Sequence, residues 1–353
     1  MKLVIFGLTI SSSWGNGHAT LWRGLCRALA ERGHRVVFFE RDVPYYAFHR
    51  DLHELPGGEL VLYPDWESAG PIALRHLADA EVAIVTSYCP DGLAATERVL
   101  DSRALRVFYD LDTPVTLDQI EKGNIVSYIG PGGLAGFDLV LSYTGGKALE
   151  LLQSKLNARR VAPLYGSVDN RLHHPRAPVE SFRADLSYIG TYAGDRQSSL
   201  HTLFLAPAER LPERRFVIAG AQYPADFPWI NNIFFVRHIA PPDHAALYCS
   251  SRLTLNVTRS AMMRMGYCPS GRLFEAAACG TPILTDSWEG LDTFFEPGRE
   301  VLVGSTTEST LEALALSDEE LRRISRRARG RATEQHSAER RALEFEELVS
   351  GTF

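Results

Sequence analysis

The sequence predicts an α/β protein with two domains, each built on a doubly wound parallel sheet. Its 353 residues exceed the length that one hydrophobic core supports comfortably, so two domains of about 150–200 residues are expected. Short apolar runs rich in Val, Ile, Leu and Phe alternate with amphipathic helical stretches, which is typical of parallel sheets covered on both faces. After Tyr165 turn formers and prolines interrupt this alternation, which then resumes. The chain therefore repeats one architecture twice.

The first domain is predicted over residues 1–166. Seven apolar runs in this half have the length and composition of buried strands, which is enough for a complete doubly wound unit. These runs are residues 3–8, 35–40, 59–63, 82–87, 106–109, 139–141 and 161–164.

A linker over residues 167–178 and a second domain over residues 179–335 are predicted next. The linker contains several turn formers and prolines, and we expect the helical segment 336–353 to pack back on the first domain. Parallel sheets bind ligands at the carboxyl ends of their strands, so we expect the two domains to face each other across one shared cleft. The apolar runs of the second domain are residues 186–189, 216–219, 233–236, 253–256, 282–285 and 301–303.

The overall charge argues against a nucleic-acid partner. The net charge is −6, and only residues 322–331 concentrate basic side chains. This run lies in a helical pattern that Ser317 and Glu320 open as a capping box, so a solvated helix face is favoured over a docking surface. Binding to nucleic acid needs a basic face that this composition lacks. A monomer or homodimer is expected.

The cysteines and the apolar segments predict the compartment. Five cysteines occur without a C-x-x-C pair, which indicates a reduced compartment and no metal site. The N-terminus lacks the pattern of a signal peptide, and no apolar run approaches the ~18 residues of a membrane span. We therefore expect a cytoplasmic protein without a transmembrane segment.

Residues 269–286 carry the strongest chemical signal. Ser270-Gly271-Arg272 opens a helix, and Gly280 ends it before a strand. The glycine permits close approach to the positive helix end and Arg272 adds a bidentate donor, so the segment predicts a diphosphate site. Glu275 lies one turn further along, where its carboxylate can accept both hydroxyls of a ribose. The alternative is an acidic residue stabilised by the helix dipole alone.

Residues 256–303 resemble the C-terminal domain of group 1 glycosyltransferases, and most closely the branch of the spore-maturation CgeB-like proteins. The resemblance covers about residues 185–345 well and the first half only through its architecture and glycine loop. It is carried by Phe274-Glu275-Ala276-Ala277-Ala278-Cys279-Gly280-Thr281-Pro282, by Glu289-Gly290-Leu291-Asp292 and by Phe294-Phe295-Glu296-Pro297-Gly298.

This resemblance implies the GT-B fold and a nucleotide-diphosphate sugar as co-substrate, with UDP- or dTDP-sugars expected. It also implies a reaction without a metal ion or other cofactor, usually with retention at the anomeric carbon. Tyr267 departs from the pattern, because the family commonly has a second glutamate eight positions before the one that corresponds to Glu275. The departure weakens the retaining assignment.

The loop over residues 9–18 leads from the first strand into a helix. Gly15 and Gly17 permit a charged ligand to approach the backbone at the helix start, although a plain turn is an equal alternative. The third glycine of a dinucleotide fingerprint is absent, and Glu40 alone supports one only weakly. His18 resembles the histidine that follows the glycine loop in many GT-B enzymes, where it can deprotonate an acceptor or donate to the diphosphate. A helix-capping histidine is the alternative.

Two acids follow the fifth apolar run of the first domain. Asp110 and Asp112 lie at the carboxyl end of that strand, where an open sheet places its ligands. Asp112 is the candidate for orienting the acceptor or for base chemistry. An Asx-turn before Pro114 is equally compatible with the pattern.

Further candidate donor ligands follow strands of the second domain. A glycine-rich turn resembles the family's donor-phosphate loop, and a later segment resembles the one whose backbone holds the base. Two arginines are placed to close over phosphates, and two acids follow the strand after the Glu275 helix. Ordinary connections and solvent-exposed pairs are the alternatives. The residues are Gly190, Tyr192 and Arg196, then His238 and Ile239, then Arg259 and Arg264, then Asp286 and Glu289.

These patterns predict a glycosyltransferase that moves a sugar to an unidentified acceptor. His18, Asp112 and Arg272 are the candidate catalytic residues, and Arg272 with helix dipoles would stabilise the diphosphate leaving group. An epimerase or hydrolase on the same scaffold, or a non-catalytic nucleotide-sugar-binding protein, would fit many of the same residues. A dehydrogenase fits least.

Overall fold

The computed structural model describes residues 1–351 and divides into two compact units. The first unit consists of Met1–Gly166 together with the C-terminal segment that begins at Ala338, and the second consists of Ser167–Ser337. Residues 352 and 353, the end of the predicted segment 336–353, lie outside the described residues. Residues 167–178 belong to the second unit.

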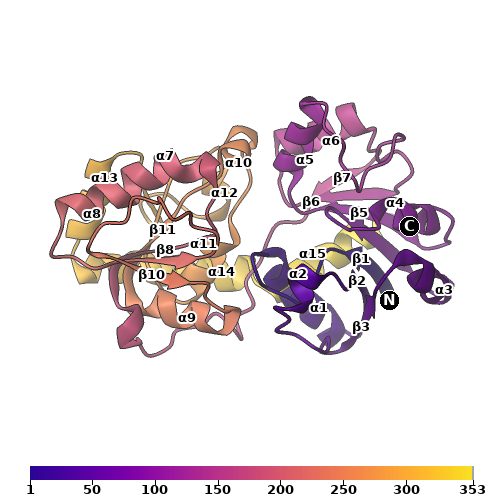
Figure 1. Ribbon diagram of the computed structural model, residues 1–353, viewed down its shortest axis with the longest axis horizontal. Helices are drawn as coiled ribbons and strands as arrows, with labels where there is room; N and C mark the ends of the chain where they lie inside the picture. The colour runs from indigo at the N-terminus through magenta and orange to yellow at the C-terminus, as the bar shows by residue number, and fades with distance from the viewer. Residues whose placement is uncertain (352–353) are drawn as a thin grey trace. The chain divides into compact units, whose positions relative to one another are not determined.

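The first unit is built on a seven-stranded parallel sheet with the order β3-β2-β1-β4-β5-β6-β7 (Figure 1). The chain begins in the middle of the sheet, moves outward to β3 and returns to β4, so the strand order reverses between β1 and β4. The strands are β1 (Lys2–Gly7), β2 (Arg35–Arg41), β3 (Gly58–Tyr63), β4 (Val82–Thr86), β5 (Leu105–Asp110), β6 (Leu139–Ser142) and β7 (Val161–Pro163).

Amphipathic helices connect these strands and cover the sheet. In α1 the apolar side chains of Trp22, Leu25 and Leu29 recur at helical spacing and are buried in the core of the unit. The helices are α1 (His18–Glu31), α2 (Pro44–Ala47), α3 (Trp66–Leu77), α4 (Gly92–Leu100), α5 (Thr113–Glu121), α6 (Lys147–Leu156) and α15 (Ala338–Ser350).

The C-terminal helix α15 is part of the first unit, where it packs against α1 (Figure 1). Ala338, Ala342 and Phe345 recur every three or four residues and are buried in the same core as α1. At the rim of this contact, the carboxylate of Glu346 pairs with Arg32 and with the Nε2 atom of His34, each at 2.6 Å. The apolar stripe therefore gives the segment its place in the unit.

The second unit is built on a six-stranded parallel sheet with the order β10-β9-β8-β11-β12-β13. The strand order reverses here between β8 and β11, as it does between β1 and β4 in the first sheet. The strands are β8 (Ala184–Ile189), β9 (Phe216–Gly220), β10 (Ile233–Arg237), β11 (Ser251–Asn256), β12 (Ile283–Thr285) and β13 (Leu302–Val303).

The helices of the second unit follow the sequence signals for helix ends. Ser317 and Glu320 form the predicted capping box at the start of α14, and α14 and α15 are separated at His336 and Ser337. The helices are α7 (Gln197–Leu200), α8 (Ala206–Arg210), α9 (Pro241–Ser250), α10 (Ser260–Met265), α11 (Gly271–Ala278), α12 (Leu291–Phe294), α13 (Thr307–Ala315) and α14 (Asp318–Gln335), with the single turns η1 (Glu180–Phe182), η2 (Gly194–Arg196) and η3 (His201–Leu205).

The prediction of two doubly wound parallel sheets is confirmed. The seven and six strands correspond to the seven and six apolar runs of the two halves, and every strand pair is parallel. Within the described residues, none of the helices combines the length and the apolar character needed to cross a bilayer.

Replacement of Phe345 tests the packing of α15 in the first unit. The ring is 1% exposed, so Phe345→Ala should lower the free energy of unfolding of this unit by about 3–5 kcal/mol through lost burial and a residual cavity. Leu74→Ala, at a side chain that is 49% exposed in the same unit, should change it by less than about 0.5 kcal/mol. Denaturant titration measures both, and hydrogen exchange should show faster exchange in α1. A loss below about 1 kcal/mol would contradict this packing.

Candidate functional site

Several candidate residues of each unit lie in the connections at the point where its strand order reverses. Connections after β1, β4 and β5 meet there in the first sheet, and connections after β8 and β11 meet there in the second. In an open parallel sheet, neighbouring loops leave this point in opposite directions and leave a crevice at the strand ends. Both units therefore have the topology of a ligand-binding α/β sheet.

In the second unit, α11 begins as the sequence predicts. The side chain of Ser270 caps the helix by accepting from the backbone N–H of Arg272 at 3.3 Å, and it also accepts from the Arg272 guanidinium at 3.1 Å. A Cβ atom placed on Gly271 would meet only the Oε1 atom of Glu275 within 4 Å, at 4.0 Å. The first turn of the helix is therefore open on the side that carries the Glu275 carboxylate.

A buried arginine lies near this helix end. Arg196 is only 8% exposed; one guanidinium nitrogen donates to the carbonyl of Thr191 at 2.9 Å, and its Nε atom has no hydrogen-bond partner among residues 1–351. Burial lowers the pKa of this guanidinium, and the positive charges of Arg272 and Arg259 lower it further. A buried cation surrounded by other cations favours an anion with several oxygen atoms.

The loops that carry these arginines are tied together. Arg259 pairs with the carboxylate of Asp195 at 3.0 Å, and the hydroxyl of Ser260 donates to the carbonyl of Asp195 at 2.8 Å. These contacts join the connection after β8 to the connection after β11 at the point of strand reversal. The guanidinium of Arg272 faces the ring of Tyr188 at 5.8 Å. Arg264 is exposed on α10.

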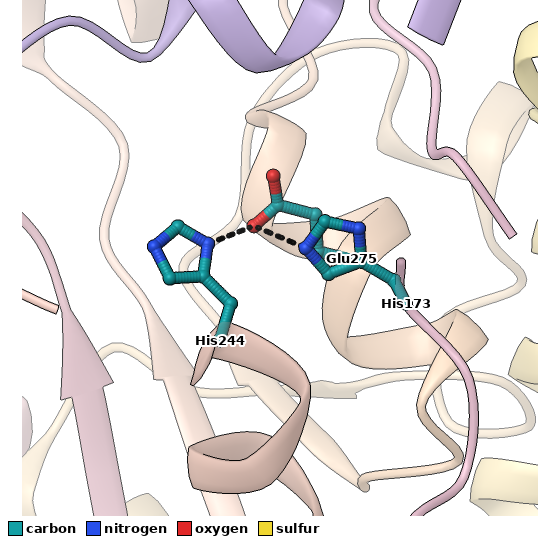
Figure 2. Close-up of side chains that lie close together, drawn as sticks. All are labelled: His173, His244 and Glu275. Carbon is teal, nitrogen blue, oxygen red and sulfur yellow. Dashed lines mark ion pairs between the residues drawn. The ribbon is translucent and has the colours of Figure 1, made fainter. Parts of the chain in front are cut away.

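Glu275 lies between two histidines on the other side of the α11 start. Its Oε2 atom is 3.6 Å from Nδ1 of His244 and 3.9 Å from Nε2 of His173, and it accepts from the hydroxyl of Tyr248 at 3.4 Å. Figure 2 shows one carboxylate oxygen directed at the two rings while the other points away from them. Burial alone raises the pKa of this carboxyl, but His173, His244 and Arg272 lower it to about 2. Glu275 is therefore ionised.

His173 and His244 are functional candidates that the sequence reasoning missed. His173 lies in the segment interpreted as a linker, yet its side chain is buried and the pKa of its imidazole is lowered by burial. His244 lies on α9, and its Nε2 atom is 3.3 Å from the carbonyl of Ile239. His173, His244 and Glu275 are far apart in the sequence and share no motif. The residues around His173 indicated only a turn-rich segment.

Other predicted residues of the second unit serve the local fold in this structure. Gly190 donates to Ala219 at 2.8 Å, and its carbonyl accepts from the Tyr223 hydroxyl at 3.1 Å. The Tyr192 ring packs on Tyr223 with a centroid distance of 5.7 Å. These contacts align the glycine-rich turn with β9, and the predicted contacts of Gly190 and Tyr192 with a donor stay predictions.

The segment after β10 has an unusual backbone. His238 adopts a left-handed conformation with φ 54° while its N–H donates to Gly220 at 3.0 Å, and the side chain of Ile239 is buried. A non-glycine residue held in this region indicates a backbone fixed by its surroundings. The expectation that this backbone holds a base stays a prediction.

The two acids after β12 differ in their surroundings. Asp286 is 5% exposed and accepts from the backbone N–H and the hydroxyl of Thr258 at 2.8 and 2.7 Å, so it ties the end of β12 to the loop after β11. Glu289 has an exposed side chain, and its carbonyl accepts from the backbone of Tyr267 at 2.7 Å. Their contacts with a donor sugar stay predictions.

In the first unit, Glu40 organises the loop after β1. This carboxylate is fully buried and accepts from the hydroxyl of Thr9 at 2.7 Å and from the N–H groups of Ile10 and Ser11 at 2.8 and 2.9 Å. Gly15 has φ 60°, which suits a glycine, whereas Gly17 is in the right-handed region. Glu40 therefore holds a loop rather than a ribose, consistent with the missing dinucleotide fingerprint.

His18 and Asp112 come together at the point of strand reversal. His18 is the first residue of α1, and its ring stacks on Tyr88 with a centroid distance of 6.3 Å. The Tyr88 hydroxyl donates to Asp112 Oδ2 at 3.0 Å. Burial lowers the pKa of His18, and the nearby Asp112 carboxylate raises it in part. A neutral imidazole beside a carboxylate is the arrangement of a general base.

Asp110, rather than Asp112, makes the local turn before α5. Oδ1 of Asp110 accepts from the N–H of Asp112 and from the hydroxyl of Thr116, each at 3.1 Å, whereas the Asp112 side chain caps no helix backbone group. The Asx-turn alternative for Asp112 is therefore not observed. Oδ2 of Asp110 is buried with no hydrogen-bond partner in the described chain. Burial raises the pKa of Asp110 to about 6.

The variant Asp110→Asn tests this buried carboxyl. In an unfolded chain the pKa is about 3.9, so the folded state binds the proton more tightly and stability falls as pH rises from about 4 to about 6. The asparagine variant lacks this loss, so its excess stability should be small near pH 4 and reach about 3 kcal/mol above pH 6. Denaturant titrations from pH 4 to pH 8 measure it, with exposed Asp101→Asn as control. An excess independent of pH would contradict the shift.

Part of the chain matches a known protein family. Residues 196–347 match the family model described as glycosyl transferase-like. No curated protein sequence matches the chain with significance. The match begins at Arg196 and spans the Arg272 and Glu275 cluster, so the segment with the strongest candidate site is also the one recognised as a glycosyltransferase domain.

Three solved structures share this architecture and are remote in sequence. A sucrose-phosphate synthase from Thermosynechococcus elongatus is 13% identical, with a TM-score of 0.72 over 99% of this chain and 98% of that chain. HepE from Anabaena, in complex with UDP and glucose, is 13% identical, with a TM-score of 0.66 over 99% and 100%. An alpha-glucosyltransferase in complex with UDP-glucose and DNA is 12% identical, with a TM-score of 0.69 over 99% of both chains.

At these identities the likeness shows the fold, and the matched segment shows the kind of domain. The predicted GT-B fold is thereby confirmed. The chain carries a glycosyl transferase-like domain at residues 196–347 within a GT-B fold, which is the domain content and the fold of a glycosyltransferase enzyme.

Proposed function

We propose that the protein transfers a sugar from a nucleoside-diphosphate sugar to an acceptor hydroxyl, and that the second unit binds the donor. The observation that carries this proposal is the buried guanidinium of Arg196 beside Arg272, with its Nε atom lacking a partner within residues 1–351. Burying a cation costs several kcal/mol unless an anion offsets it. A diphosphate supplies that anion and enough oxygen atoms for both arginines and the α11 end.

The nucleoside is proposed to be uridine or thymidine, with its ribose or deoxyribose on Glu275. The ionised carboxylate keeps one oxygen, Oε1, on the open side of Gly271. A ribose hydroxyl that donates to this oxygen would place the diphosphate near the start of α11, one helical turn away. HepE was solved with UDP-glucose and the alpha-glucosyltransferase with UDP, and their shared architecture supports UDP as the first donor base to test.

In the proposed reaction, an acceptor oxygen forms a bond to the anomeric carbon while the bond from that carbon to the diphosphate breaks. The leaving diphosphate takes the electron pair, and Arg196, Arg272 and the helix end stabilise its developing charge without a metal ion. His18 and Asp112 in the first unit are proposed to hold the acceptor and manage its proton.

Stereochemistry and acceptor class are finer parts of the same proposal. Retention at the anomeric carbon is the proposed outcome, as the resemblance to the CgeB-like branch implies, and the anomeric configuration of the product tests it. The acceptor is proposed to be a glycan, a protein or a small metabolite rather than DNA, because the chain has a net charge of −6.

The variant Arg196→Met tests the diphosphate site. Removing a buried cation that other cations repel should leave the free protein as stable as before or more stable. Loss of a charge-assisted contact should weaken UDP binding about 10–100-fold. Calorimetric titration with UDP, dTDP, GDP and ADP measures the affinities, and Arg322→Met, at an exposed position of the same unit, is the control. A variant that is less stable but binds UDP normally would show a structural role only.

The variants Glu275→Ala and Gly271→Ala separate ribose binding from diphosphate binding. Glu275→Ala should weaken UDP binding about tenfold or more while leaving inorganic pyrophosphate nearly unaffected, since pyrophosphate has no ribose. Gly271→Ala places a methyl group in open space at the helix end, so the fold should be kept while both ligands bind less tightly. Equal losses for UDP and pyrophosphate in Glu275→Ala would remove the ribose assignment.

A further inference from the structure

A group of metal-ligand side chains meets at Glu275. One nitrogen of His173, one nitrogen of His244 and one oxygen of Glu275 lie within 4.8 Å of one another. We propose that His173, His244 and Oε2 of Glu275 form a binding site for a divalent transition-metal ion of the Zn²⁺ type. The proposed transfer reaction needs no metal ion, so this site goes beyond it. The site also departs from the expectation, based on the cysteine spacing, that the protein has no metal site.

The donor atoms lie near the spacing that such an ion needs, and the two histidine nitrogens, which are within 4.8 Å of each other, would have to approach by up to about 1.4 Å. Oε2 of Glu275 lies 3.6 Å from Nδ1 of His244 and 3.9 Å from Nε2 of His173. Two ligands at about 2.1 Å from a tetrahedral Zn²⁺ ion are about 3.4 Å apart, so each pair with the carboxylate exceeds that spacing by a few tenths of an ångström. Figure 2 shows both rings directing a nitrogen at the same carboxylate oxygen.

The hydrogen bond of the His244 ring leaves one ring nitrogen facing Glu275. Its Nε2 atom is 3.3 Å from the carbonyl of Ile239, a group that can only accept, so the Nε2 atom carries the proton. Nδ1 is then the ring nitrogen that faces the carboxylate oxygen, at 3.6 Å, and it has no hydrogen-bond partner among the described residues. A carbonyl that orients a ligand histidine in this way is the usual outer partner in metal sites.

His173 adds an independent observation. The residue is 1% exposed and its side chain, which faces Glu275, is fully buried. Both ring nitrogens lack a hydrogen-bond partner within the described part of the chain. Buried polar groups are normally satisfied, so two unsatisfied nitrogens beside an ionised carboxylate need a further partner. A cation between the three ligand atoms gives a partner to the His173 nitrogen that faces Glu275, and two histidines with one glutamate are an established zinc-ligand set.

The proposed ion and the proposed nucleotide use different oxygens of one carboxylate. Oε2 faces the histidines and the Tyr248 hydroxyl, whereas Oε1 lies on the Gly271 side. The ion would therefore fix the orientation of Glu275 rather than block it. If the proposed function also holds, UDP should bind the Zn²⁺-loaded protein several-fold more tightly than the metal-free protein.

Metal content of the full chain tests the site. The protein is stripped with a chelator, incubated with Zn²⁺ or Co²⁺, passed over a desalting column and measured by elemental mass spectrometry. The background is Cys249→Ser, because Cys249 on α9 is a free thiol outside the buried core and thiolates also bind zinc. The variants are His173→Ala, His244→Ala and Glu275→Gln, and His201→Ala, an exposed histidine of the same unit, is the matched control.

We expect one ion per chain in the Cys249→Ser background and in His201→Ala, with a Co²⁺ spectrum of nitrogen and oxygen ligands that lacks a thiolate band. Each of the three site variants should lose more than about 100-fold in affinity, since changes to outer partners alone cost about 10–100-fold. Glu275→Gln keeps the shape of the side chain and decides the result if His173→Ala does not fold.

Two results would overturn the proposal: less than one ion per chain in the Cys249→Ser background, or unchanged affinity in His244→Ala and Glu275→Gln. The UDP measurement separates this inference from the proposed function. Absence of UDP binding with or without Zn²⁺ would remove the proposed function and leave the metal site standing. Binding of UDP without binding of Zn²⁺ would do the opposite.

Discussion

The candidate site of the second unit depends on one buried positive charge. Arg196 lies in η2, in the connection that follows β8. Its guanidinium donates to the Thr191 carbonyl and lies near the positive charges of Arg272 and Arg259. Such an arrangement costs stability in the free protein, because burial and like charges both oppose the ionised form. The connections after β8 and β11, which are joined by the contacts of Asp195 with Arg259 and Ser260, nevertheless hold the guanidinium in place. The fold thus positions a buried cation whose unfavourable charge an anionic ligand would offset.

The sheet topology explains why the chemistry of each unit gathers at one place. The first unit brings His18 after β1 and Asp112 after β5 to the reversal of strand order, with Tyr88 from the end of β4 between them. The second unit brings Arg196 after β8 to the start of α11. The two groups differ in chemistry: the first offers a neutral imidazole and a carboxylate, and the second offers cations and a helix end.

Local signals in the sequence predicted the fold and the start of α11. The apolar runs gave the number of strands, and Ser270 with Gly271 gave the start of α11, because strand burial and helix capping are encoded within a few neighbouring residues. The partners of Glu275 were missed. His173 contacts Glu275 from a segment rich in turn formers. Such long-range contacts depend on the tertiary structure and leave no local signal in the sequence. Glu40, which gave only weak support for a dinucleotide fingerprint, instead accepts hydrogen bonds from the loop after β1.

The most direct test of the account is a crystal structure of the protein with UDP. The account predicts that diphosphate oxygens contact the Nε atom of Arg196 and the Arg272 guanidinium, while a ribose hydroxyl lies on Oε1 of Glu275. A nucleotide bound elsewhere, with the Arg196 guanidinium still buried and untouched, would contradict it.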